Sequence, residues 1–150
     1  MLHFPEAPLP CMARIRQRFP VASLKDVRSA ARQELELLPL PLDLGRKRVA
    51  IGVGSRGIAH LPDLVEEVVA YVKRRNGVPF IVPAMGSHGG GTAAGQRAVL
   101  ASCGITEEST GVPILAGEES VRIGFNAAGV PVYCDAAAWQ ADWLIPINRV

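Results

Sequence analysis

The chain has 150 residues, of which 49% are hydrophobic and 20% charged. These fractions are typical of one globular domain with its own apolar core. The formal net charge is +2 and aromatic residues are 5% of the chain, so no basic or stacking surface indicates binding to nucleic acid or to an anionic membrane.

The cysteines and the first residues indicate the compartment. Cys11, Cys103 and Cys134 are odd in number and widely spaced, which predicts neither a disulfide framework nor a zinc site. Residues 1–11 lack the basic start and apolar run of a signal peptide, and no apolar stretch is long enough to span a bilayer. We therefore expect a reduced, cytoplasmic protein, with an unpatterned leader at 1–11 and an α/β domain at 12–150.

Two elements are expected in the first third of the chain. Residues 12–19 alternate apolar and basic side chains, which is compatible with a short strand. Apolar residues recur at helical spacing over 24–38, so a helix is expected there. Ser23 is its candidate N-cap, and Pro39 ends it.

A strand, a helix and a second strand follow in the middle of the chain. Residues 48–54 form a short apolar run, typical of a buried parallel strand. Residues 61–75 carry an apolar stripe, with Pro62 in the first turn and basic residues in the last. Residues 80–82 are the next strand. This order predicts a parallel βαβ unit with a right-handed crossover.

The last third is expected to hold shorter elements. They are a helix over 92–103 capped by Thr92, a turn over 105–109, a hairpin over 120–135, a short helix over 136–141 capped by Asp135, and a buried strand over 143–147. The fold class predicted is α/β, with a Rossmann-like, mostly parallel sheet, flanking helices and a β-hairpin excursion.

The chain ends at residues 148–150, directly after the carboxyl end of the last expected strand. In open α/β sheets, ligands bind beyond the carboxyl ends of the strands. We therefore expect the domain to be truncated and a C-terminal domain to be absent. A complete small domain with a last edge strand is the alternative.

Two glycine-rich loops follow the two strands of the predicted βαβ unit, and each carries a polar side chain. Arg56 lies in the first loop, and His88 lies in the second, within the run 86–92. Because parallel strands end at one edge of a sheet, both side chains are expected to face one ligand. Arg56 can clamp a carboxylate or phosphate, and His88 can act as a general acid or base. An exposed, idle histidine in a tight turn is the alternative.

Two other readings of these loops place a nucleotide or anion there. The backbone N–H groups of 89–92, at a helix start, can hold an anion. Gly52, Gly54 and Gly57 match the spacing of a dinucleotide fingerprint. However, the second strand lacks the acidic residue that binds ribose, which disfavours an NAD-type oxidoreductase. A non-catalytic nucleotide- or anion-binding α/β module stays open. The three histidines are scattered and predict no metal site.

At these loops the sequence resembles the lactate racemase family, the nickel-pincer 2-hydroxyacid racemases and epimerases. The resemblance rests on three segments: Gly54–Ile58, Pro83–Gly90 with Thr92, Gly95 and Gln96, and Ile147–Val150. It runs from about residue 12 to the last residue and covers the N-terminal part of the family pattern. Within the family, the chain resembles a distant branch.

The resemblance implies a nickel pincer nucleotide as cofactor, a small 2-hydroxy acid as substrate, and a hydride shuttle with histidine acid/base catalysis. His88 matches the first catalytic histidine. The implied cofactor- or substrate-binding residues are Ser55, Arg56, Gly57, Gly86, Ser87, Gly89, Gly90 and Thr92. The second histidine, the tethering lysine and the nickel-binding histidine lie further along the family pattern. The parent protein is therefore expected to be an isomerase, and this chain alone to be inactive.

Overall fold

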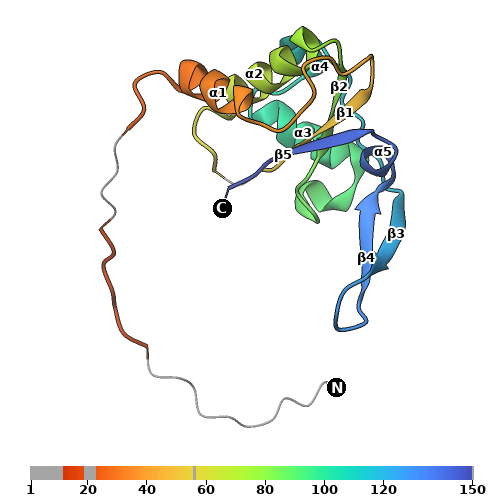
Figure 1. Cartoon of the computed structure of the whole chain (residues 1–150). Helices are drawn as coiled ribbons and strands as arrows, with labels where there is room; N and C mark the ends of the chain where they lie inside the picture. Colours follow the sequence, from red (N-terminus) through yellow and green to blue (C-terminus); the bar gives the residue numbers. More distant parts are fainter. Residues whose placement is uncertain (1–11, 19–22, 56, 150) are drawn as a thin grey trace.

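The structure is a computed structural model that describes residues 12–18, 23–55 and 57–149. The predicted leader at 1–11, Phe19, Arg56 and Val150 lie outside the described residues. The centre of the fold is a three-stranded sheet in the order β2-β1-β5 (Figure 1). Its strands are β1 (Arg48–Val53), β2 (Val78–Pro83) and β5 (Trp143–Ile147).

The predicted βαβ unit is confirmed. β1 pairs in parallel with β2 from Arg48↔Val78 to Val53↔Pro83, and α2 (Leu61–Arg74) connects the two strands. Alternate residues of β1 and the stripe of α2 share one core, whose members include Val49, Ile51 and Val65, all 0% exposed. Burial of this stripe explains why the helical period of 61–75 was readable from the sequence.

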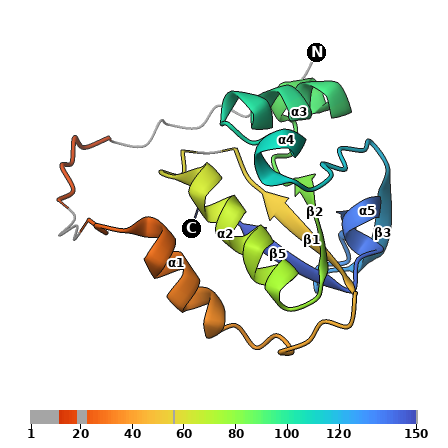
Figure 2. The same cartoon turned by 90° about the horizontal axis from the view of Figure 1, so that it is seen from above.

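A second helix, α1 (Val27–Glu36), lies beside α2 on the same face of the sheet (Figure 2). Glu67 of α2 accepts two hydrogen bonds from the Arg32 guanidinium, at 3.1 and 2.8 Å. The predicted N-cap, Ser23, is wrong. Asp26 caps the helix, because its carboxylate accepts a hydrogen bond from the backbone N–H of Ser29 at 3.0 Å.

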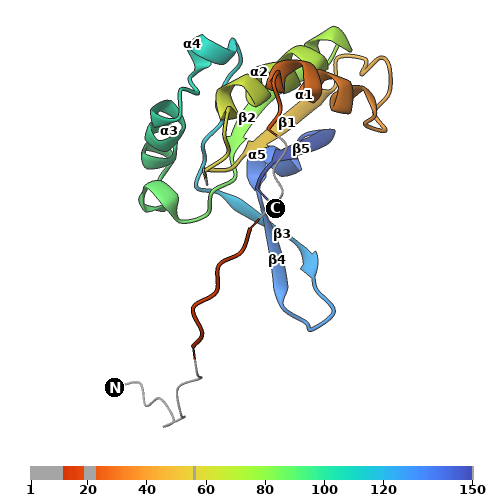
Figure 3. The same cartoon turned by 90° about the vertical axis from the view of Figure 1, so that its left-hand side faces the viewer.

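The opposite face of the sheet is covered by α5 (Ala136–Trp139) and the base of a hairpin. The hairpin consists of β3 (Ser120–Phe125) and the antiparallel β4 (Pro131–Asp135), as predicted. It projects away from the sheet and the helices (Figures 1 and 3). Asp135 caps α5 by accepting from the N–H of Ala138 at 2.9 Å, also as predicted.

Three short helical elements connect β2 to the hairpin. They are the 3-10 turn η1 (His88–Gly91), α3 (Ala93–Ser102) and α4 (Glu107–Thr110). Thr92 caps α3 as predicted, with its hydroxyl accepting from the N–H of Gly95 at 3.1 Å. After α4 the chain returns to the sheet, where Ile114 forms a parallel bridge with Ile81 and covers the outer edge of β2.

Two expectations about strands are corrected. β5 pairs in parallel with β1 but is less buried than predicted, because it is an edge strand among the described residues and its side chains alternate in exposure. Leu144, for example, is 50% exposed. Residues 12–18 are exposed and form no strand, so the alternation there did not predict pairing. Within the described ranges no helix is long and apolar enough to cross a membrane.

Candidate functional site

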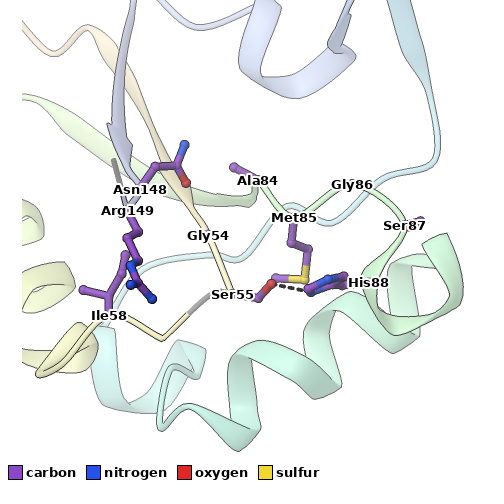
Figure 4. A pocket seen from close by; sticks show the side chains of 10 residues that line it. All are labelled: Gly54, Ser55, Ile58, Ala84, Met85, Gly86, Ser87, His88, Asn148 and Arg149. Atoms are coloured by element: carbon purple, nitrogen blue, oxygen red, sulfur yellow. Dashed lines mark hydrogen bonds between the residues drawn. The ribbon is translucent and has the colours of Figure 1, made fainter. Parts of the chain in front are cut away.

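A pocket of about 680 Å³ opens at the carboxyl edge of the parallel sheet (Figure 4). Its walls come from the segments that follow β1, β2 and β5, the three strands that end at this edge. The lining residues are Gly54, Ser55, Ile58, Ala84, Met85, Gly86, Ser87, His88, Asn148 and Arg149. The pocket therefore lies where open α/β sheets bind their ligands.

The first two loops meet through one hydrogen bond. Ser55 Oγ lies 2.6 Å from Nδ1 of His88, and both side chains are partly buried (Figure 4). Ser55 follows β1 directly, and His88 begins the turn after β2. The bond ties up one ring nitrogen of the histidine, so Nε2 is the nitrogen left to meet a ligand.

The glycine loop is shaped by close backbone packing against α3. Gly89, Gly90 and Gly91 have φ of +65°, +71° and +70°, a conformation that favours glycine. The backbones of Gly89 and Gly95 touch, because a Cβ on Gly95 would overlap the carbonyl group of Gly89. This contact fixes where the chain can place His88.

Two side chains of the α3 segment hold the same loop. Thr92 Oγ1 donates to the carbonyl of Gly89 at 3.2 Å, and Gln96 Nε2 donates to the carbonyl of Gly86 at 2.9 Å. Both bonds join the glycine loop to the start of one helix. The backbone around His88 is therefore fixed from two sides, although its glycines would allow many conformations.

The third wall follows β5. Asn148 packs against the end of β1 so closely that a Cβ on Gly54 would lie 2.5 Å from its Oδ1. Arg149 is exposed, and its Nη1 would lie 3.7 Å from a Cβ on Gly57. Of the described residues that line the pocket, His88 and Arg149 are the ionisable ones. Because none is a carboxylate, the pocket favours a ligand with negative charge.

The start of α3 follows directly after residues 89–92, whose backbone N–H groups were expected to hold an anion, and it has a carboxylate from the same chain. Glu118 accepts a hydrogen bond from the backbone N–H of Ala93 at 3.3 Å. The N–H of Gly95 is satisfied by Thr92. The start of α3 is thus capped by its own chain and lies apart from the pocket lining.

The structure brings only part of the predicted site together. Ser55, Gly86, Ser87 and His88 line the pocket, whereas Gly89, Gly90 and Thr92 are absent from its lining and shape the loop behind it. Gly57 is exposed and neighbours Arg149. Arg56 lies outside the described residues.

Six lining positions are not among the predicted site residues: Gly54, Ile58, Ala84, Met85, Asn148 and Arg149. Asn148 and Arg149 were predicted to follow the carboxyl end of the last strand and belong to the resemblance, but no role was assigned to them. The available signal was their place directly after the last apolar run, since that run is a third strand parallel to β1.

Two carboxylates with lowered pKa values, Glu36 and Glu67, lie on helices α1 and α2 and not among the residues that line the pocket. The hydrogen bond from Arg32 lowers the pKa of Glu67, and the hydrogen bond from Arg75 lowers the pKa of Glu36. These groups join α1 to α2. They stabilise the fold rather than form a site for chemistry.

No family model, curated protein or solved structure matches the chain. Among the described residues, no group of three His, Cys, Asp or Glu side chains is arranged to hold a metal ion. The pocket and the sequence motifs that form it are therefore the basis for the function proposed below.

Proposed function

We propose that this chain supplies one acid/base histidine and an anion-binding wall to a nickel-pincer-dependent racemase or epimerase of 2-hydroxy acids. The observation that carries the proposal is one pocket that holds His88, bonded to Ser55 at 2.6 Å, together with Arg149. A 2-hydroxy acid has a carboxylate and a hydroxyl on adjacent carbons. The pocket offers a cation for the first and a histidine for the second.

Each residue has a defined task in this proposal. Arg149 binds the substrate carboxylate, since a guanidinium matches its two oxygens. Nε2 of His88 takes the proton from the substrate hydroxyl as the carbon becomes a ketone, and gives it back when the hydroxyl is restored. Met85 and Ile58 supply apolar walls, which limit water at the reacting carbon.

Two features of the pocket support an anionic, organic cofactor in this proposal, namely the absence of a carboxylate among its described lining residues and the space beside Gly86. Gly86 has φ +60°, and a Cβ there would meet nothing within 4 Å, so the loop leaves open space beside its backbone. Gly86 and Ser87 of the pocket wall would hold the cofactor, which leaves Arg149 for the substrate carboxylate. The bound cofactor would accept the hydride from the substrate Cα and return it. In this proposal the metal ligands, the tethering lysine and the second histidine come from a further domain.

The reaction class can be tested with the polypeptide that includes this chain, loaded with the cofactor. Single enantiomers of several 2-hydroxy acids are incubated in D2O, and products are followed by chiral chromatography and mass spectrometry. We expect the opposite enantiomer to form with the Cα hydrogen retained, because a hydride moves out and back without reaching solvent. Racemisation with deuterium at Cα, or no turnover of any 2-hydroxy acid, contradicts the proposal.

The non-catalytic anion-binding module remains the second candidate, since Arg149 and the glycine loop suffice for it. It leaves the Ser55–His88 hydrogen bond without a role. Calorimetric titration of the chain with nucleotides and inorganic phosphate separates the two. Tight nucleotide binding that survives His88→Ala, with no turnover of hydroxy acids, favours the module.

A further inference from the structure

We infer that Ser55 is a positioning residue that holds His88 as its Nδ1–H tautomer, so that Nε2 keeps the lone pair that receives the ligand's proton. This inference rests on the proposed function, in which His88 acts as a base. Its structural basis is the 2.6 Å contact between Ser55 Oγ and His88 Nδ1.

The backbones of both partners are held in place, so the hydrogen bond acts on the orientation of the His88 ring. Ser55 follows the end of buried β1, where the N–H of Gly54 donates to the carbonyl of Ile147 at 3.1 Å and the N–H of Ala84 donates to that of Val53 at 2.8 Å. His88 stands before two glycines with positive φ. Three hydrogen-bonded or packed glycines fix the loop but not the rotation of the His88 side chain, and Ser55 offers that ring a hydroxyl directly after the end of β1.

The direction of the hydrogen bond decides what the ring can do. A neutral imidazole has one N–H donor and one acceptor nitrogen, and a serine hydroxyl can serve either. If Nδ1–H donates to Ser55 Oγ, the lone pair is on Nε2 and His88 is a base toward the pocket. If Ser55 donates to Nδ1, Nε2 carries the proton. The neutral His88 ring can then donate a hydrogen bond to the ligand but cannot accept a proton from it.

Acceptance by Ser55 suits both protonation states of a working base. When Nε2 takes a proton, both ring nitrogens are donors. The bond from Nδ1–H to Ser55 then persists and becomes charge-assisted. With the opposite direction, the ring would already carry the Nε2 proton and would have no lone pair facing the pocket. Acceptance by Ser55 is therefore the arrangement that a proton-transfer cycle at Nε2 requires.

The tautomer can be read directly by long-range 1H–15N spectra of the protein labelled at its histidines. His3, His60 and His88 give three sets of signals, and His88→Gln identifies the relevant set. At a pH where the ring is neutral, we expect Nδ1 to show the shift of a protonated nitrogen and Nε2 that of a bare one. In Ser55→Ala the two shifts should move toward each other, as the tautomers mix.

Two variants make the test specific. Ser55→Thr keeps the hydroxyl and should restore the wild-type pattern, while Ser102→Ala, a serine on α3 that bonds the Val99 carbonyl, should leave it unchanged. In the cofactor-loaded protein, Ser55→Ala should lower kcat by about 10–100-fold, the range found when a metal-ligating histidine loses the partner that orients its ring.

A wild-type spectrum with the proton on Nε2, or one that Ser55→Ala leaves unchanged, overturns the inference. The spectra need no turnover, so they stay decisive if the protein racemises nothing. In that case a held Nδ1–H tautomer without activity would refute the proposed function and leave the Ser55 contact as an orienting one. Activity with the opposite tautomer would refute the role of Ser55 alone.

Discussion

Gly95 offers a sharp test of how the site loop is held, because two general rules predict opposite effects of Gly95→Ala. Gly95 lies in the first turn of α3, and replacing a helical glycine by alanine normally stabilises a helix by about 1 kcal/mol. Here, however, the new Cβ would overlap the carbonyl oxygen of Gly89. The Cβ would also lie 2.6 Å from the carbonyl carbon of Gly89 and 2.9 Å from Thr92 Oγ1.

The structure indicates that the cost of the overlap exceeds the gain in helix propensity. Gly89 O is a backbone atom, so either the loop or the helix must move. That movement disturbs the Thr92–Gly89 and Gln96–Gly86 hydrogen bonds, at 3.2 and 2.9 Å. Each such bond contributes about 1 kcal/mol, and overpacking costs roughly 1–3 kcal/mol. With both bonds lost and after the gain in helix propensity, we expect the free energy of unfolding to fall by about 2–4 kcal/mol.

Urea unfolding, followed by circular dichroism, measures the change as a shift in midpoint at constant m-value. In a chain of this size Tm should fall by roughly 4–16 °C. Gly117→Ala is the matched control, since its Cβ would meet only the Glu119 nitrogen at 4.0 Å, and we expect it to change stability by less than about 0.5 kcal/mol. A Gly95→Ala protein that equals or exceeds the wild type in stability would refute this account of the loop.

Two more predictions concern acid stability and ligand binding. Hydrogen bonds from Arg32 and Arg75 lower the folded pKa values of Glu67 and Glu36, so their stabilisation is present above the ordinary glutamate pKa of about 4.3 and is lost as the pH falls below it. Between pH 7 and pH 3 the urea midpoint should fall less in Glu67→Gln than in the wild type. An equal fall in both proteins contradicts this prediction. Arg149→Gln should raise KM for a 2-hydroxy acid by about 10–100-fold and change kcat little, because the variant loses a charged hydrogen bond to the substrate carboxylate. An unaltered KM contradicts the proposal that Arg149 binds this carboxylate.

The sequence predicted those parts of the fold that local patterns encode. The stripe of α2 and the cap at Thr92 were readable because they depend on neighbours within four residues. The N-cap of α1 was misplaced because Ser23 and Asp26 are both good caps, and the choice is made by the packing of α1 on α2. The exposure of Leu144 could not be read either, because it depends on β5 having one strand beside it.

The site was predictable as far as the βαβ unit reaches. Ser55 and His88 follow two strands that are close in sequence, so their meeting at one edge follows from parallel pairing. Arg149 joins them through the β1–β5 pairing, whose partners Val49 and Trp143 are far apart in the chain. The capture of the α3 start by Glu118 has the same non-local origin. Both depend on tertiary contacts that no local spacing reveals.

The most direct test of the central claim is the rate of racemisation with and without His88. Wild-type and His88→Ala proteins, matched for cofactor content by their nickel-to-protein ratio, are given a single enantiomer of a 2-hydroxy acid that the wild type turns over. If His88 moves the hydroxyl proton, the alanine variant should be slower by about 10²–10⁴-fold, the range for a general acid or base. An alanine variant that racemises at the wild-type rate would contradict the claim that this pocket is a site of proton transfer.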